Sequence, residues 1–104
     1  MLSYRHAFHA GNHADVLKHF LLVQLTGYLC QKEAPFWYID THAGAGLYAL
    51  DAGHATKLAE HIDAIGRLWQ RKALPAPLAE YVDLVRALNP NTNTNPDGQL
   101  RAYP

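Results

Sequence analysis

The chain has 104 residues, of which 49% are hydrophobic and 17% are charged. This composition supplies enough apolar surface for the core of one small domain, and it argues against two domains or an intrinsically disordered chain. Lysine plus arginine equals aspartate plus glutamate at nine each, so a uniformly basic domain is excluded and any contact with RNA would need a local basic patch.

Cysteine content and hydropathy narrow the class of protein further. Cys30 is the only cysteine, which excludes an internal disulfide and a cysteine-based zinc site, and its apolar neighbours favour a buried, unreactive thiol. The N-terminus lacks the basic-then-apolar pattern of a signal peptide. No apolar run is as long as a membrane span, which needs about 18 residues. We therefore expect a cytoplasmic protein that does not contact a membrane.

The first twelve residues are polar and aromatic, and they begin a stretch that is rich in histidine. Four of the seven histidines lie within the first nineteen positions, namely His6, His9, His13 and His19. A helix could place the first three on one face, which leaves open a histidine-rich metal-binding domain. However, Gly11 and Asn12 interrupt any helix there, and no carboxylate accompanies these histidines before Asp15. A polar arm with surface histidines explains the same residues.

A helix is predicted from residue 13 to residue 31. Asn12 is a favourable N-cap residue, and Asp15 is an acid in the first turn, where the helix dipole stabilises it. The apolar residues cover more than one stripe, which predicts a well-buried helix; they are Val16, Leu17, Phe20, Leu21, Val23 and Leu25. His19 shares the first half of this surface, where a histidine is more often a hydrogen-bonded core residue than a ligand contact.

Residues 36–39 are four consecutive bulky residues, which predicts a short strand covered on both faces, as in a parallel sheet. The strand ends at Asp40, and a loop of small residues with Gly44 and Gly46 follows it. Ligands of open α/β sheets bind beyond the carboxyl ends of strands, where glycines allow a close backbone approach and an acid can accept hydrogen bonds. An ordinary strand followed by a glycine turn explains this pattern equally well.

The second half of the chain is predicted to be mostly helical. Apolar residues keep helical spacing over 54–71 and again over 77–88, where Pro77 is tolerated in a first turn. The Asn-rich stretch 89–98 predicts a mobile, turn-rich loop, and 99–103 predicts a short extended segment.

Two stretches carry a specific resemblance to a known family. They are Met1–His19 (MLSYRHAFHAGNHADVLKH) and Asp40–Gly46 (DTHAGAG), and the likeness continues through IGRLWQ at 65–70, LP at 74–75 and GQLRAYP at 98–104. Together they resemble the bacterial large-subunit ribosomal RNA adenine-N6 methyltransferase family over nearly the whole chain.

The resemblance implies an α/β fold of the Rossmann-like methyltransferase class, with a helical insertion after its first strand. Residues 1–104 would be the N-terminal part of that domain, a mostly helical piece that holds only the first strand of the sheet. Its expected parts are a substrate-facing arm at 1–12, a helix at 13–31, the first strand and glycine loop at 36–46, and the insertion at 54–88.

The resemblance also implies the ligands and the residues that contact them. The cofactor would be S-adenosyl-L-methionine, in a pocket formed by His19, Asp40, His42, Gly44 and Gly46. The substrate would be the N6 amine of an adenine in 23S ribosomal RNA, approached by Tyr4, Arg5 and His6. We expect modification before subunit assembly, because the target base must be unstacked to enter a pocket. The full-length protein is expected to be a monomer.

The chain departs from this family in length. Family members are more than twice as long and carry an Asp-Pro-Pro-Tyr motif that accepts hydrogen bonds from the adenine amine. Here the nearest sequences are Asn89-Pro90 and Asn95-Pro96-Asp97, which are predicted turns. We therefore expect these residues to supply cofactor and RNA contacts, but no catalytic residue and no metal site. The alternatives are a non-catalytic RNA- or cofactor-binding module and the histidine-rich metal-binding domain.

Overall fold

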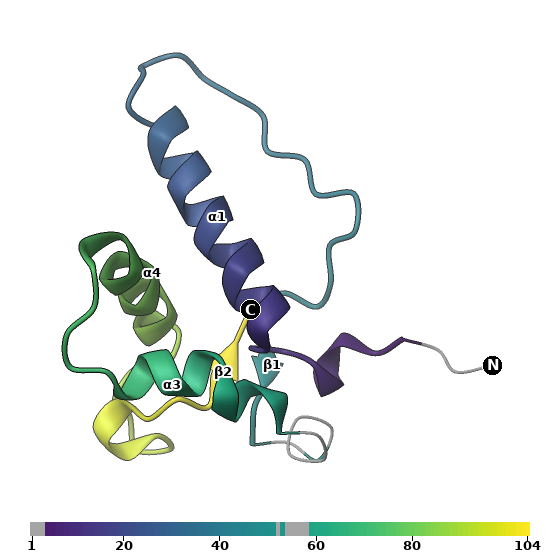
Figure 1. Cartoon of the computed structure of the whole chain (residues 1–104). Coiled ribbons are helices and arrows are strands. Elements are labelled where there is room, and N and C mark those ends of the chain that lie inside the picture. The colour runs from purple at the N-terminus through teal and green to yellow at the C-terminus, as the bar shows by residue number, and fades with distance from the viewer. Residues whose placement is uncertain (1–3, 52, 54–58) are drawn as a thin grey trace.

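The computed structural model describes residues 4–51, 53 and 59–104. Figure 1 shows a long helix that stands away from a cluster of shorter elements, and a segment without regular structure that returns beside it. In chain order the elements are η1 (His6–Phe8), α1 (His13–Leu29), β1 (Tyr48–Ala49), η2 (Glu60–Asp63), α3 (Ile65–Gln70), α4 (Ala76–Ala87), η3 (Pro96–Gly98) and β2 (Ala102–Tyr103). The strands β1 and β2 pair antiparallel, with Tyr48 opposite Tyr103 and Ala49 opposite Ala102.

The start of α1 agrees with the sequence prediction, whereas its burial does not. The side chain of Asn12 accepts a hydrogen bond from the Asp15 amide at 3.0 Å, so it caps the helix. Leu17 and Leu25, however, are 61% and 62% exposed, and Cys30 beyond the helix end is exposed too. The predictions of a well-buried helix and a buried thiol are therefore wrong, because only one side of α1 packs against the core; its core-facing residues are Val16, Phe20 and Val23.

The predicted strand at 36–39 is also wrong for the described residues. This segment has no strand structure, and Trp37 is 89% exposed. A strand needs neighbours for its backbone amides and carbonyls, and bulky side chains on both of its faces need two covering layers. None of the described residues pairs with 36–39, so neither requirement is met.

The predicted continuous helix at 54–71 is broken where the structure describes it. Residues 54–58 lie outside the described part. Beyond them, Ala59 has a left-handed φ of 53°, and Ala64 separates η2 from α3 with φ −120° and ψ −98°. The break has a tertiary cause, because the Ile65 amide donates to the Gly11 carbonyl at 3.2 Å and the Ile65 side chain is fully buried. The helix predicted at 77–88 is confirmed as α4.

The core lies where α1, α3, α4 and the two strands meet. Its largest fully buried side chains are Tyr81, Tyr103 and Ile65. The Phe20 ring of α1 meets Tyr81 of α4 edge to face, with 6.3 Å between the ring centroids. The hydroxyl groups of Tyr81 and Tyr103 are hydrogen-bonded at 2.6 Å, and this contact connects α4 to β2 inside the core. Both tyrosines are thus placed by aromatic packing and by a polar contact.

The Asn-rich loop is better organised than its composition predicts. Asn89 is buried, and its side-chain amide donates to the carbonyls of Val85 and Ala102 at 3.0 and 2.9 Å. Its carbonyl oxygen accepts from the amides of Arg101 and Ala102, both at 2.8 Å. Asn89 therefore makes every hydrogen bond that its amide group allows, and it fixes β2 against the end of α4.

Replacing Asn89 with alanine is expected to lower the free energy of unfolding by about 2–4 kcal/mol, because the substitution removes a buried amide group whose oxygen accepts from the backbone amides of Arg101 and Ala102. Denaturant titration of the chain measures this loss. The matched control is Asn91→Ala, since Asn91 is exposed in the same loop. An equal effect of both substitutions would contradict the role given to Asn89.

Candidate functional site

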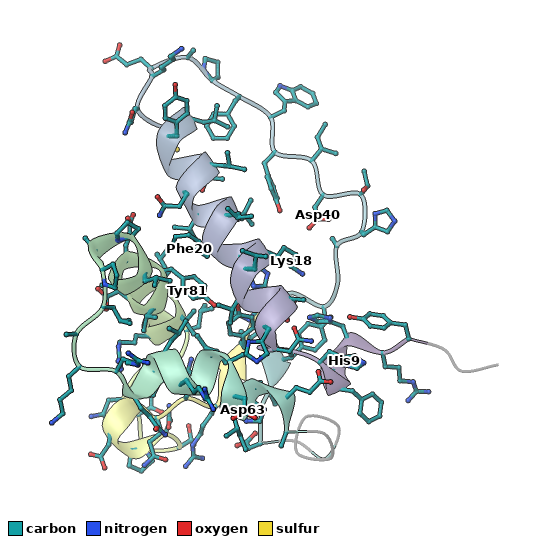
Figure 2. The ribbon with its side chains drawn as sticks, viewed as in Figure 1. His9, Lys18, Phe20, Asp40, Asp63 and Tyr81 are labelled. Atoms are coloured by element: carbon teal, nitrogen blue, oxygen red, sulfur yellow. The ribbon has the colours of Figure 1, made fainter. Side chains whose placement is uncertain are left out.

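A cleft with a volume of about 970 Å³ lies between α1 and residues 38–48; we call it the α1 cleft. Figure 2 shows Lys18 on α1 and Asp40 on the returning segment, on opposite sides of this space. Of the residues predicted to contact cofactor or RNA, all except Arg5 line it; they are Tyr4, His6, His19, Asp40, His42, Gly44 and Gly46. Arg5 is exposed beside them on the arm.

The walls of the α1 cleft combine polar groups with apolar side chains. Leu21, Leu25 and Ile39 line it, and all three are otherwise exposed. These exposed apolar side chains form one wall of the cleft. Small-molecule sites usually combine such a wall with a few polar groups that orient the ligand.

His19 occupies the boundary between the core and the α1 cleft. Its Nδ1 atom lies 2.8 Å from the Tyr103 hydroxyl, and its side chain also lines the cleft. Burial lowers the pKa of His19 below its usual 6.5, and the negative charge of Asp15 offsets only part of this effect. His19 is accordingly both a hydrogen-bonded core residue and a cleft residue, so the two interpretations from sequence are compatible.

The loop after Asp40 is held by contacts among its own residues. The Asp40 carboxylate accepts from the His42 amide at 3.0 Å, and the Ala45 amide donates to the Tyr48 hydroxyl at 3.2 Å. Gly46 has a left-handed φ of 89° and open space where a Cβ would lie, whereas a Cβ on Gly44 would come 2.5 Å from the Tyr48 hydroxyl. Gly46 thus leaves room at the cleft, while a side chain at Gly44 would displace the Tyr48 hydroxyl, which accepts from the Ala45 amide.

Asp15 is the buried polar centre beneath the arm. One of its oxygens lies 2.7 Å from His6 Nε2 and accepts from the Gly11 amide at 3.0 Å, and the other lies 3.0 Å from Lys18 Nζ. A carboxylate that is 2% exposed needs such partners, because an unpaired buried charge is very costly. Asp15 therefore connects the arm to α1.

Two histidines of the arm hold the side chain of Tyr4 in place. The Tyr4 hydroxyl lies 2.6 Å from His6 Nδ1, and its ring stacks on His9 with 5.3 Å between centroids and 3° between planes. His9 in turn contacts Glu60 of η2 at 2.9 Å. The ring is nevertheless 73% exposed, so its outer face is accessible.

The three histidines that suggested a metal site do not share a common ligand position in the structure. His6 and His9 contact different carboxylates, Asp15 and Glu60, and His13 is exposed. Within residues 4–51, 53 and 59–104, no three His, Cys, Asp or Glu side chains gather as metal ligands would.

Sequence reasoning missed several residues that line the cleft, among them Lys18 and Tyr48, and it missed Tyr103 in the core beside it. Lys18 lines the cleft beside Asp15, and the spacing of three between an acid and a base on a helix could have indicated this pair. Tyr103 lies directly behind His19, although 84 residues separate them, and no local pattern predicts that contact.

In the part of the chain that the structure describes, no helix is long and apolar enough to cross a membrane.

Comparisons with known proteins agree with the resemblance. The family described as "Ribosomal RNA large subunit methyltransferase D, RlmJ" matches residues 33–104. Two proteins named ribosomal RNA large subunit methyltransferase J are similar to the chain. The Escherichia coli protein is 50% identical over 104 residues, which are 100% of this chain and 35% of that protein. The Haemophilus influenzae protein is 49% identical over 89 residues, which are 86% of this chain and 32% of that protein.

A crystal structure of a Legionella pneumophila protein is similar in fold, with a TM-score of 0.76 and 35% identity over 91% of this chain. The match covers 32% of that protein. The chain thus spans about a third of the length of the relatives that it matches.

The lowered pKa of His19 predicts how stability depends on pH. As the pH falls through the unfolded-state value of 6.5, the unfolded chain takes up a proton that folded His19 resists, so stability decreases. The melting temperature should therefore fall more steeply between about pH 7 and pH 5 in the native chain than in His19→Gln. The positive charges of Lys18 and His6 strengthen the effect. His61→Gln should flatten the slope separately, because burial also lowers the pKa of His61, and His13→Gln is the control, because His13 is exposed. Identical slopes in the native chain and His19→Gln would contradict the assignment.

Proposed function

Because the chain belongs to the family described as Ribosomal RNA large subunit methyltransferase D, RlmJ, we propose that it forms the cofactor pocket and the RNA-facing arm of an S-adenosylmethionine-dependent enzyme. The substrate proposed for the full-length enzyme is the N6 amine of an adenine in 23S ribosomal RNA. We propose that this adenine is methylated before the ribosomal subunit assembles. The observation that carries the proposal is the α1 cleft, where the residues assigned to the cofactor and those assigned to RNA line one space.

The chemistry of the α1 cleft fits S-adenosylmethionine, which supplies an activated methyl group when it is bound. Its volume of about 970 Å³ lies within the range of small-molecule pockets. His19 and Lys18 offer hydrogen-bond donors for a carboxylate, and Asp40 offers an acceptor for an amine or for hydroxyl groups. Leu21 and Leu25 give the cleft an apolar wall that would exclude water around the cofactor.

The position of the arm supports its proposed contact with RNA. An enzyme that modifies a base must take that base out of its stack, and aromatic side chains can then stack on it or on its neighbours. Tyr4 presents an exposed ring at the cleft, while His6 below it is held by Asp15. Arg5 lies beside them and offers a positive charge to the phosphate backbone.

The catalytic groups are proposed to lie in the part of the enzyme that these 104 residues do not cover. The sequence contains no Asp-Pro-Pro-Tyr. Asn95 is buried, and it hydrogen-bonds the backbone of Gln99 through both its side-chain nitrogen and its oxygen. Since Asn89 is likewise occupied by backbone groups, neither Asn-Pro pair offers a substitute for that motif.

The Rossmann-like fold proposed for the full-length domain would supply the partners that segment 36–39 lacks among the described residues. Phe36, Trp37 and Ile39 are exposed next to a backbone that has no strand partner among the described residues. In the complete domain, parallel strands on either side would satisfy this backbone, and helices would cover both of its faces.

Asp40 provides the direct test of the pocket. The assay uses a chimera in which this chain replaces the matching residues of the Escherichia coli relative, and it follows labelled methyl transfer to protein-free 23S ribosomal RNA. The chimera should be active. Asp40→Ala should abolish cofactor binding in calorimetry and leave the circular dichroism unchanged, because Asp40 is exposed and its hydrogen bonds among the described residues join only Tyr38 and His42.

The control for this substitution is Asp83→Ala, an exposed carboxylate on α4 outside the cleft. A folded chimera without methyl transfer would refute the proposed function, whereas unchanged cofactor affinity in Asp40→Ala would refute the placement of the pocket.

Tyr4 tests the separation of the RNA contact from the cofactor contact. In the chimera, Tyr4→Ala should reduce RNA methylation by about 5-fold to 150-fold, the equivalent of one stacked base at roughly 1–3 kcal/mol. Cofactor affinity should change little, whereas His19→Ala should weaken it. Tyr28→Ala is the control, because Tyr28 is exposed at the far end of α1. Equal losses of cofactor affinity in Tyr4→Ala and His19→Ala would contradict this separation.

A further inference from the structure

A chain of hydrogen bonds runs from the centre of the core to the α1 cleft. The Tyr81 hydroxyl lies 2.6 Å from the Tyr103 hydroxyl, which lies 2.8 Å from His19 Nδ1. Tyr81 and Tyr103 are buried, whereas His19 is half-buried and lines the cleft. The three side chains come from α4, β2 and α1, so the contact depends on the complete packing of this part of the molecule.

The direction of these hydrogen bonds follows from counting protons. Each tyrosine hydroxyl has one proton to donate, and the ring of a neutral histidine has one protonated nitrogen and one bare nitrogen. If Tyr81 donates to Tyr103 and Tyr103 donates to His19 Nδ1, both buried hydroxyl protons have an acceptor. If Nδ1 carried the proton, it would donate to Tyr103, and one hydroxyl proton would have no acceptor among the described residues. Since a buried donor without a partner is costly, the first arrangement is favoured.

We infer that Tyr103, supported by Tyr81, is a positioning residue that holds His19 in its Nε2–H tautomer and thereby presents a hydrogen-bond donor to the α1 cleft. No hydrogen-bond partner of Nε2 is found within the described residues, and His19 lines the cleft, so this donor is available to a ligand. The inference rests on the proposed function for the identity of the ligand. The matching group of S-adenosylmethionine is its carboxylate, because a carboxylate accepts hydrogen bonds and the competing tautomer would present only a bare nitrogen to it.

Burial agrees with this assignment. The lowered pKa of His19 keeps the ring neutral near pH 7, and a neutral ring is required for Nδ1 to accept from Tyr103. The pKa of Tyr103 is raised by burial and by its contact with Tyr81, so its hydroxyl keeps the proton that it donates. Burial also raises the pKa of Tyr81 to about 12, which keeps that donor protonated as well.

The tautomer can be measured without any cofactor. Long-range proton–nitrogen correlation spectra of the labelled 104-residue chain distinguish the two neutral forms of His19 near pH 7.5. The native chain should show the Nε2–H form, and Tyr81→Phe should keep it, because Tyr103 still donates. Tyr103→Phe should give a mixture of tautomers and a higher pKa of His19, because Nδ1 has lost its donor. An Nδ1–H form in the native chain would overturn the inference, even if neither variant folded.

Cofactor affinity then separates positioning from simple packing. Calorimetry with S-adenosylhomocysteine should show about tenfold weaker binding for Tyr103→Phe, as expected from the loss of one oriented hydrogen bond. Tyr81→Phe should weaken binding less than threefold, although each variant removes one buried hydroxyl and both should lower the melting temperature.

Equal loss of affinity in the two variants would overturn the positioning role. If the native chain and the chimera bound no S-adenosylhomocysteine while His19 was in the Nε2–H form, the proposed function would fail and the tautomer assignment would stand.

Discussion

The hydroxyl group of Tyr103 is the point at which three parts of this chain are tied together. It meets Tyr81 of α4 and His19 of α1, and Tyr103 itself belongs to β2, which pairs with β1. Apolar packing alone would bring these elements together in several ways, since the hydrophobic effect is not directional. Hydrogen bonds between buried groups allow far fewer arrangements, because a shift of one element leaves a polar group without a partner. The relative position of α1 and α4 is therefore specified by this contact together with the packing of Phe20 on Tyr81.

Asp15 is a second polar centre, and it organises the start of α1 on the same side of the cleft. It holds His6, the Gly11 amide and Lys18, so the arm and the first turn of α1 form one unit. Gly11 is required there: it has a φ of 77°, and a Cβ on it would lie 2.8 Å from the Ile65 side chain. Asp15 and His19, the residue that contacts Tyr103, lie four residues apart on the same helix. The cleft between α1 and the returning segment thus has one wall that is firmly held.

The other wall is held much less firmly. Residues 30–47 are exposed throughout, and the hydrogen bonds of the Asp40 loop join residues that are close in sequence. Segments with few buried apolar contacts open at low free-energy cost, so the returning segment is expected to be the least stable part of the described structure. A ligand in the cleft would contact both walls, and its binding energy would then stabilise this segment.

Local patterns were sufficient for those features that depend on neighbours in sequence. The N-cap at Asn12, the start of α1 and the whole of α4 follow from capping and helical periodicity, and these elements form as predicted. The residues of the proposed site were also identified from sequence, through the resemblance and through the pattern of an acid and two glycines after residue 39. That they line one cleft could not be deduced, because this depends on how the returning segment lies beside α1.

What the sequence alone determined is therefore the family, the helices α1 and α4, and the candidate contact residues. Only the tertiary structure decided the break between η2 and α3, where a hydrogen bond to Gly11 replaces a helical one, and the exposure of 36–39, where bulky residues lack partners among the described residues. It also decided the contact between His19 and Tyr103, from which we infer the tautomer of His19. The physical reason is the same in each case: helix caps and periodicity act between residues a few positions apart, whereas buried hydrogen bonds and covered faces join residues that the sequence keeps far apart.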